Sequence, residues 1–185
     1  MEQHSNDARW LRQIAQGDKD AFAELLCAHL SSLLAFVKRF VPEQAEAEDI
    51  TQEVFTRIWE HADRWQQREQ SPRSWFFKIA YNLCIDFLRK QKDTTDTLDT
   101  LISPDTPEQA LHVSQDKTLM NNAMDTLPER QRTALYLCAY QGLSNKEAAS
   151  IMAISTEALE SLLARGRRTL RNYFQNLEGA HYETA

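Results

Sequence analysis

The sequence is poor in helix-breaking residues and in patterns that bind metals. Its 185 residues include only four glycines and five prolines, which favours helices over turn-rich β structure. Cys27, Cys84 and Cys138 are an odd number with no C-x-x-C spacing, which is typical of small core residues in a reducing compartment. The five histidines show no metal-ligand spacing either. We therefore expect no metal site and no cofactor.

Long apolar runs and catalytic motifs are also missing. No apolar stretch approaches the length of a membrane span, and the opening MEQHSNDARW is not a basic segment followed by an apolar one. We find no phosphate-binding loop and no nucleophile–base pair, so we expect neither an enzyme nor a small-molecule substrate. Together these absences favour a non-enzymatic, cytoplasmic protein.

Negative charge is concentrated in the middle of the chain. The formal net charge is −6, yet residues 1–92 and 119–185 are each near neutral, because residues 93–118 carry six acidic side chains and one basic. The stretch DTTDTLDTLISPDTPEQA has no helical apolar stripe, which favours a flexible acidic linker over a long surface loop within one domain. We therefore predict an all-α protein in which two small helical domains, residues 7–92 and 112–177, are joined by a linker at 93–111.

The first domain reads as a series of amphipathic helices. Asp18 can cap a helix that ends at Pro42, and Ser71 followed by Pro72 marks the start of another. Between them, AEDITQEVFTRIWEH carries one polar face, made of Asp49, Gln52, Glu53, Thr56 and Glu60. On spacing alone this face is a solvated acidic surface, with protein docking as the alternative.

The helix that begins at Ser71 carries a mixed polar stripe. Its members recur at three- and four-residue steps and are Trp75, Lys78, Asn82, Asp86 and Arg89. Rings that stack on bases, cations that follow phosphates and amides that bond base edges would suit single-stranded DNA. From spacing alone, an ordinary amphipathic helix with a partly buried Trp75 is the simpler interpretation.

The second domain has three predicted helix starts. Thr126 with Glu129 and Ser144 with Glu147 are each spaced as a capping box, and Ser155 can cap the last helix. The tripeptide AIS separates the last two helices, which is typical of a helix-turn-helix.

The last helix has an apolar face and a basic face. Winding at 100° per residue gathers Leu159, Leu162, Leu163, Gly166, Leu170 and Tyr173 on the core side. The four arginines of LLARGRRTLRNYF lie opposite, with Glu157 and Glu160 near the helix start. A basic face on the second helix of a helix-turn-helix favours DNA contact over a merely solvated surface.

Four segments in this order carry a resemblance. AEDITQEVFTRIWEH, SWFFKIAYNLCIDFLRK, LPERQRTALYLCAYQGLSNKEAASIMAIS and ALESLLARGRRTLR resemble the extracytoplasmic-function (ECF) sigma factors of bacterial RNA polymerase, in the sigma-70 family, over nearly the whole chain. The resemblance implies an alternative sigma factor that binds core polymerase at its clamp and flap and directs promoter-specific transcription initiation. It implies a region 2 domain for core binding and −10 recognition, a region 4 domain for −35 recognition, and control by an anti-sigma factor.

The resemblance also assigns roles to residues of this chain. Core polymerase binding falls to Asp49, Gln52 and Glu53, with Phe55 and Trp59 in support. Strand separation and −10 reading fall to Arg64, Arg73, Trp75, Lys78, Asn82, Asp86, Arg89 and Lys90. Contact with the −35 element falls to Ser161, Arg165, Arg167, Arg168 and Arg171. The chain departs from the family where Glu160 and Leu162 replace commonly basic residues and Ala153 replaces a common glycine.

A stand-alone helix-turn-helix regulator is the main alternative. Its N-terminal helices would sense a ligand or form a dimer, and it would bind an operator without polymerase. In that case Asp49 and Gln52 would have no role.

Overall fold

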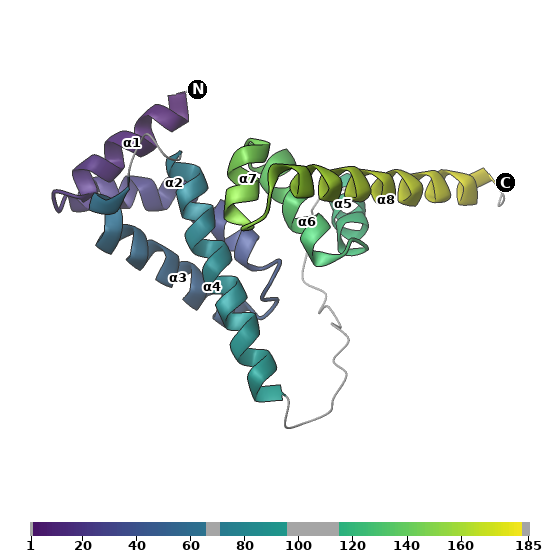
Figure 1. Ribbon diagram of the computed structural model, residues 1–185, viewed down its shortest axis with the longest axis horizontal. Coiled ribbons are helices and arrows are strands. Elements are labelled where there is room, and N and C mark those ends of the chain that lie inside the picture. The colour runs from purple at the N-terminus through teal and green to yellow at the C-terminus, as the bar shows by residue number, and fades with distance from the viewer. Residues whose placement is uncertain (1, 66–70, 96–114, 183–185) are drawn as a thin grey trace. The chain divides into compact units, whose positions relative to one another are not determined.

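The protein, seen in a computed structural model, is built from helices in two separate units (Figure 1). The structure describes residues 2–65, 71–95 and 115–182, and within these ranges no strand occurs. The prediction of an all-α chain is therefore confirmed. The units comprise Met1–Asp99 and Thr100–Ala185. Of the predicted linker, residues 93–95 belong to a helix, and the remainder lies outside the described residues.

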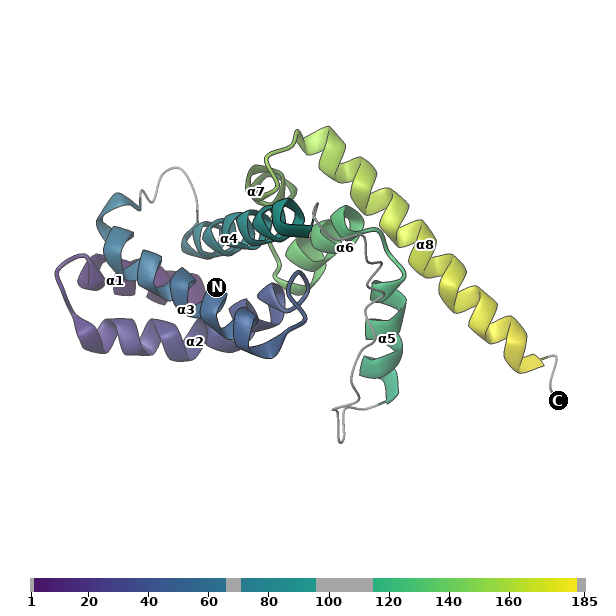
Figure 2. The same ribbon diagram turned by 90° about the horizontal axis from the view of Figure 1, so that it is seen from below.

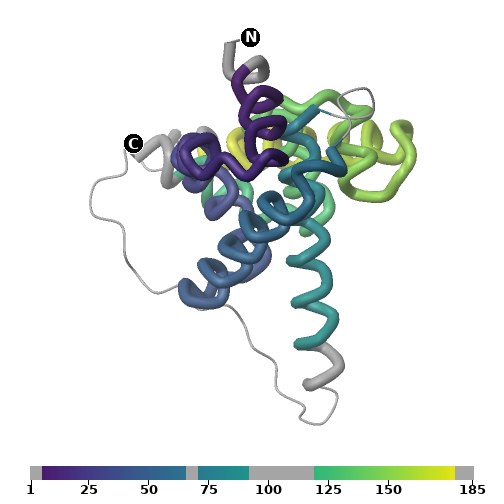
Figure 3. The backbone as a smooth tube through the Cα atoms, turned by 90° about the vertical axis from the view of Figure 1, so that its left-hand side faces the viewer, coloured from purple at the N-terminus to yellow at the C-terminus, as the bar shows by residue number. Residues whose placement is uncertain are grey.

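The first unit is a bundle of crossing helices (Figures 2 and 3). Its elements are α1 (Glu2–Ile14), α2 (Lys19–Val37), α3 (Gln44–His61), the 3₁₀ turn η1 (Ala62–Arg64) and α4 (Pro72–Thr95). Helix α2 packs on α1, α3 and α4, and α4 also packs on α1 and α3. Each of these helices therefore has a buried side and a side turned away from the bundle.

Two predicted caps hold the helix starts of this unit. The Asp18 carboxylate accepts the backbone N–H groups of Asp20 and Ala21, each at 3.0 Å. The Ser71 hydroxyl accepts the N–H of Ser74 at 3.2 Å, and α4 begins at Pro72 as predicted. Each cap satisfies amide groups that have no partner within their own helix.

Aromatic rings fill the core of the first unit. Phe36, Phe76 and Phe77 are almost completely buried. The ring of Phe36 meets Phe77 edge to face at a centroid distance of 5.2 Å and Phe40 at 5.1 Å. Such pairs add about 0.5 to 1.5 kcal/mol each beyond the area they bury. The pair of Phe36 and Phe77 holds α4 against α2.

A buried polar pair joins three helices of the same unit. His29 Nε2 lies 2.7 Å from Asp7 Oδ1, and the two side chains are 5% and 3% exposed. The His29 ring also meets Phe76 edge to face at 5.1 Å. Because a buried polar group without a partner costs about 1 to 3 kcal/mol, this pair specifies how α1 sits on α2 and α4. The sequence alone gave His29 no distinctive role.

Helix α2 corrects the expectation about membrane spans. Within the part of the chain that is described, it alone is long and apolar enough to cross a membrane by length and composition. A core helix passes the same test, and here Leu25, Leu33 and Phe36 are buried while α2 contacts three other helices.

The second unit contains the remaining helices. These are α5 (Gln115–Asp125), α6 (Glu129–Leu135), the π-helical turn η2 (Tyr136–Tyr140), α7 (Asn145–Ile151) and α8 (Thr156–Tyr182). Helix α8 packs on α5, α6 and α7. The other helices of the unit therefore all pack on this one long helix.

One of the two predicted capping boxes is present and the other is not. The Ser144 hydroxyl accepts the Glu147 N–H at 3.3 Å, and the Glu147 carboxylate accepts the Ser144 N–H at 2.9 Å, which confirms that box. The pairing of Thr126 with Glu129 is wrong, because the Thr126 hydroxyl instead donates to the Ala123 carbonyl at 2.7 Å. Pro128 takes the N-cap position of α6 without a side-chain cap.

Replacing Phe36 by alanine should destabilise the first unit by about 3 to 5 kcal/mol, because the surrounding rings can only partly fill the cavity. Tryptophan fluorescence during urea unfolding reports on this unit selectively, since all four tryptophans precede residue 99. Leu30→Ala is the control: Leu30 lies on the same helix, is 41% exposed, and should cost at most about 1 kcal/mol. Equal losses in both variants would contradict the proposed core.

Candidate nucleic-acid interface

Helices α7 and α8 form a helix-turn-helix with a well-defined turn. The Ile154 N–H donates to the Ala149 carbonyl at 3.1 Å and the Ala153 N–H to the Ser150 carbonyl at 3.4 Å, which is a Schellman motif. Ala153 has a φ of 52°, a left-handed conformation that costs a non-glycine residue about 1 to 2 kcal/mol. The Ser155 hydroxyl accepts the Ala158 N–H at 3.2 Å and caps α8 as predicted.

The inner face of α8 is held against α6. Leu159, Leu162 and Leu163 are buried, as the winding of the helix predicts. A Cβ atom added at Gly166 would lie 2.8 Å from Leu135 Cδ1, so the two helices approach closely at this point. Leu162 replaces a residue that is commonly basic in the family. Its burial in the core means that it cannot read bases.

The outer face of α8 carries the predicted −35 residues. All of them are exposed, namely Ser161, Arg165, Arg167, Arg168 and Arg171. The Arg165 Nε–H donates to the Ser161 carbonyl at 3.3 Å, one turn earlier in the same helix. Four guanidinium groups along one exposed helix face form a surface suited to phosphates and base edges.

Two carboxylates lie on the same helix ahead of the arginines. A hydrogen bond from its own backbone amide and another from Ser155 lower the pKa of Glu157, so it is ionised at neutral pH. Glu160 Oε1 accepts a hydrogen bond from Asn145 Nδ2 at 3.3 Å. The sequence did not indicate Asn145, although the confirmed Ser144 cap places it as the first residue of α7.

The predicted −10 stripe lies along α4. Trp75 and Lys78 are half-buried at its start, whereas Asn82, Asp86, Arg89 and Lys90 are exposed further along. Trp75 packs beside Phe76 at a ring distance of 5.9 Å, so its ring is partly held by the core. Arg89 Nη1 lies 3.7 Å from Asp86 Oδ1, but both side chains are well exposed, so this ion pair contributes little stability.

Two predicted −10 arginines flank residues 66–70, which lie outside the described residues. Arg64 is exposed at the end of η1, and Arg73 is half-buried in the first turn of α4. Arg64 and Arg73 therefore belong to two different elements, η1 and α4. In sequence, both come shortly before Trp75, the first residue of the polar stripe.

The predicted docking face lies on α3. Asp49, Gln52 and Glu53 are exposed on one side of this helix. Behind them Phe55 is 4% exposed and Trp59 is half-buried. Both rings meet Phe22 of α2 edge to face, at centroid distances of 6.4 and 5.2 Å. Phe55 and Trp59 therefore hold α3 in place from behind its exposed polar groups.

An apolar groove borders this face. It has a volume of about 490 Å³ and lies between α2 and α3. Its walls are Phe22, Leu26, Leu30, Leu34, Glu48, Thr51, Gln52, Phe55 and Thr56. Leu30 is 41% exposed in it, an unusual exposure for a large apolar side chain. The α2 residues of the wall recur every four positions, on a different side of the helix from the buried Leu25 and Leu33. This spacing was the sequence signal that could have indicated the groove.

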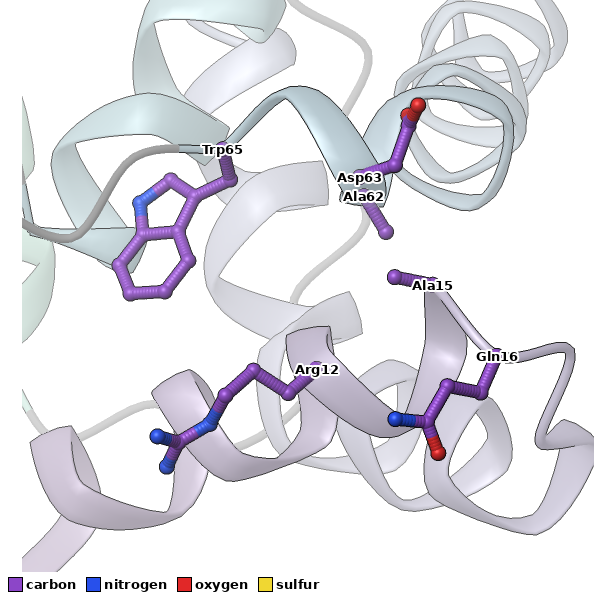
Figure 4. Close-up of a pocket in the computed structure, with 6 residues that line it drawn as sticks. All are labelled: Arg12, Ala15, Gln16, Ala62, Asp63 and Trp65. Atoms are coloured by element: carbon purple, nitrogen blue, oxygen red, sulfur yellow. The ribbon is translucent and has the colours of Figure 1, made fainter.

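A second hollow lies between the end of α1 and η1 (Figure 4). Its volume is about 330 Å³, and it is lined by Arg12, Ala15, Gln16, Ala62, Asp63 and Trp65. Figure 4 shows the Asp63 carboxylate turned away from Arg12 and Gln16, so its polar groups do not converge as in a ligand site. Among the residues that the structure describes, no three His, Cys, Asp or Glu side chains are grouped to hold a metal.

Comparison with protein families matches both units. Sigma-70 region 2 matches residues 25–94, and Sigma-70, region 4 matches residues 118–170. The ECF RNA polymerase sigma factor SigM of Bacillus subtilis is 30% identical over 151 residues, which cover 80% of this chain and 91% of SigM. SigE of Mycolicibacterium smegmatis is 30% identical over 168 residues, and this chain spans 65% of its length.

A solved structure shows a similar fold. The sigma factor RpoE of Bartonella quintana, in complex with the anti-sigma factor NepR, is 25% identical to this chain, with a TM-score of 0.73. The likeness covers 85% of this chain and 98% of the RpoE chain.

Replacing Gly166 by leucine should separate α8 from α6, because even a Cβ atom there is too close to Leu135. We expect the free energy of unfolding of the second unit to fall by about 1 to 3 kcal/mol. Native-state hydrogen exchange of the α6 and α8 amides measures this loss. Ala164→Leu, at an exposed position of the same helix, is the control and should change little. Unchanged exchange in the Gly166 variant would rule out the close approach.

Proposed function

This chain belongs to the ECF sigma factors of the sigma-70 family, and from that premise we propose how its surfaces divide the work of promoter-specific transcription initiation. It acts as a non-enzymatic factor in the cytoplasm that binds core RNA polymerase and promoter DNA. The observation that carries the proposal is the presence, on one chain, of both sigma regions in order, each with an exposed polar face fixed by a buried one.

The face of α3 is the proposed docking surface for the polymerase clamp. Asp49, Gln52 and Glu53 offer carboxylate and amide groups to a basic or polar partner, and the adjoining groove offers apolar area. Phe55 and Trp59 act from behind, because they fix the helix that carries these groups. A rigid, pre-formed face loses little conformational entropy on binding.

The α4 stripe is the proposed reader of the −10 element. A partly held ring at Trp75 is restrained yet accessible to stack on an unstacked base, and Asn82 can bond to base edges. Lys78, Arg89 and Lys90, together with Arg64 and Arg73, supply positive charge along the strand. Asp86 is the one acidic member of this set and forms its ion pair with Arg89.

The outer face of α8 is the proposed −35 reader, and polymerase supplies much of the total affinity. Residues 119–185 carry as many acidic as basic side chains, so the second unit has no strong non-specific attraction to DNA. The arginines therefore position the helix locally once polymerase has brought the promoter close.

An anti-sigma factor is the proposed regulator. The structurally similar RpoE of Bartonella quintana was solved with its anti-sigma factor NepR, which supports a protein partner of this class. A partner that covered the α3 face would compete directly with core polymerase.

Replacing Asp49 and Gln52 together by alanine should weaken binding to core polymerase by at least about tenfold, equivalent to 1.4 kcal/mol, because both exposed groups lose their partners. Binding is measured by titrating labelled protein with core enzyme. Gln16→Ala with Glu24→Ala is the matched control, since Gln16 in the turn after α1 and Glu24 on α2 are both exposed and lie outside α3. Unchanged affinity, with tight promoter binding in the absence of polymerase, would support the stand-alone regulator instead.

Replacing Arg165 and Arg168 by alanine should reduce run-off transcription from promoters that require their −35 element. Each lost phosphate contact should also lower the salt dependence of promoter binding by about 0.9 in the log–log slope. Arg130→Ala, exposed on α6 of the same unit, is the control. If the double variant is equally active on promoters that require their −35 element and on promoters that do not, these arginines do not contact the DNA.

A further inference from the structure

Glu160 is an unusual residue for the surface on which it lies. It is exposed in the second turn of α8, the second helix of the helix-turn-helix. Along the same side follow Ala164, Arg167 and Arg171, at four, seven and eleven residues, so Glu160 opens a row that then becomes basic. Phosphates repel a carboxylate. Glu160 must therefore either make a contact that compensates for this repulsion or lie away from the DNA.

The structure restrains this carboxylate from a neighbouring helix. The side-chain N–H of Asn145, at the start of α7, donates to Glu160 Oε1 at 3.3 Å. The oxygen of the same amide lies 3.8 Å from Cys138 Sγ, which donates to it. The amide is thus held at both ends, and it directs Glu160 from across the turn. An exposed carboxylate that served only solubility would need no such orientation.

The chemistry of a carboxylate restricts what it can read. An ionised glutamate only accepts hydrogen bonds, and one oxygen of Glu160 already accepts from Asn145. In the major groove, guanine presents two acceptors and thymine an acceptor and a methyl group, whereas cytosine presents its N4 amino group alone. Adenine presents its N6 amino group beside the N7 acceptor, which faces a carboxylate unfavourably. A single free carboxylate oxygen therefore matches cytosine best.

We infer that Glu160, oriented by Asn145, is a specificity-determining residue that accepts a hydrogen bond from the N4 amino group of one cytosine in the −35 element. The inference rests on the proposed function, since it places α8 in the major groove of that element. Arg167 and Arg171, further along the same side, offset the repulsion between the carboxylate and the phosphates. Discrimination and affinity are thus carried by different residues of one helix.

The test is run-off transcription with core polymerase on a promoter library randomised across the −35 element. The unaltered protein should favour cytosine at one position by roughly 5- to 100-fold, the range of a good base contact. Glu160→Gln should shift the preference at that position towards adenine, because glutamine can bond to adenine N6 and N7 together. Asn145→Ala should weaken the cytosine preference at the same position and leave the other positions unchanged.

Matched controls separate the possible outcomes. Glu129→Gln and Asn122→Ala make the same side-chain changes at exposed positions of α6 and α5, and should leave every preference unchanged. An active Glu160→Gln variant with the original preference at every position would overturn the inference and leave the proposed function intact. An unaltered protein that gives no polymerase-dependent transcript from any library member would instead overturn the proposed function.

Discussion

Burial of one face on each functional helix is the constraint on which the rest of the structure depends. On α8, Leu159, Leu163 and Gly166 are committed to the core, which leaves the arginines no direction except outward. On α4, Phe76 and Phe77 play the same part for the polar stripe. A helix has two opposed faces, so the choice of core residues is at the same time the choice of contact surface.

The two units apply this constraint by different means. In the first, large rings and the buried pair of Asp7 and His29 hold four helices, and the pair allows one arrangement because either group alone would be left unsatisfied. In the second, the buried leucines of α8, the close approach at Gly166 and well-formed caps hold the helices together. Capping and close approach fix how α8 packs on its neighbours, which suits the proposed role of this helix in presenting its outer face to a DNA duplex.

Sequence reasoning succeeded where the cause was local. The caps at Asp18, Ser71 and Ser144, the helix-turn-helix and the core face of α8 follow from residues a few positions apart. It failed at Thr126, because the hydroxyl donates back to the Ala123 carbonyl and Pro128 takes the N-cap position of α6. It also gave no indication of the Asp7–His29 pair or of the contact between Asn145 and Glu160, because each depends on how separate helices pack. The α2–α3 groove left only a four-residue spacing of apolar residues on α2 as its signal.

The near neutrality of both terminal segments gives a reason for acidic residues on the contact surfaces. If polymerase supplies the affinity, α8 gains little from adding further arginines and can retain a carboxylate that favours some base pairs over others. A glutamate near guanine O6 or thymine O4 would set acceptor against acceptor, so it excludes wrong sequences as well as selecting right ones. Removing positive charge also weakens binding at non-promoter sites, which compete in far greater number. Acidic residues on the proposed DNA surface therefore suit a factor whose task is to discriminate among sequences and not to bind tightly alone.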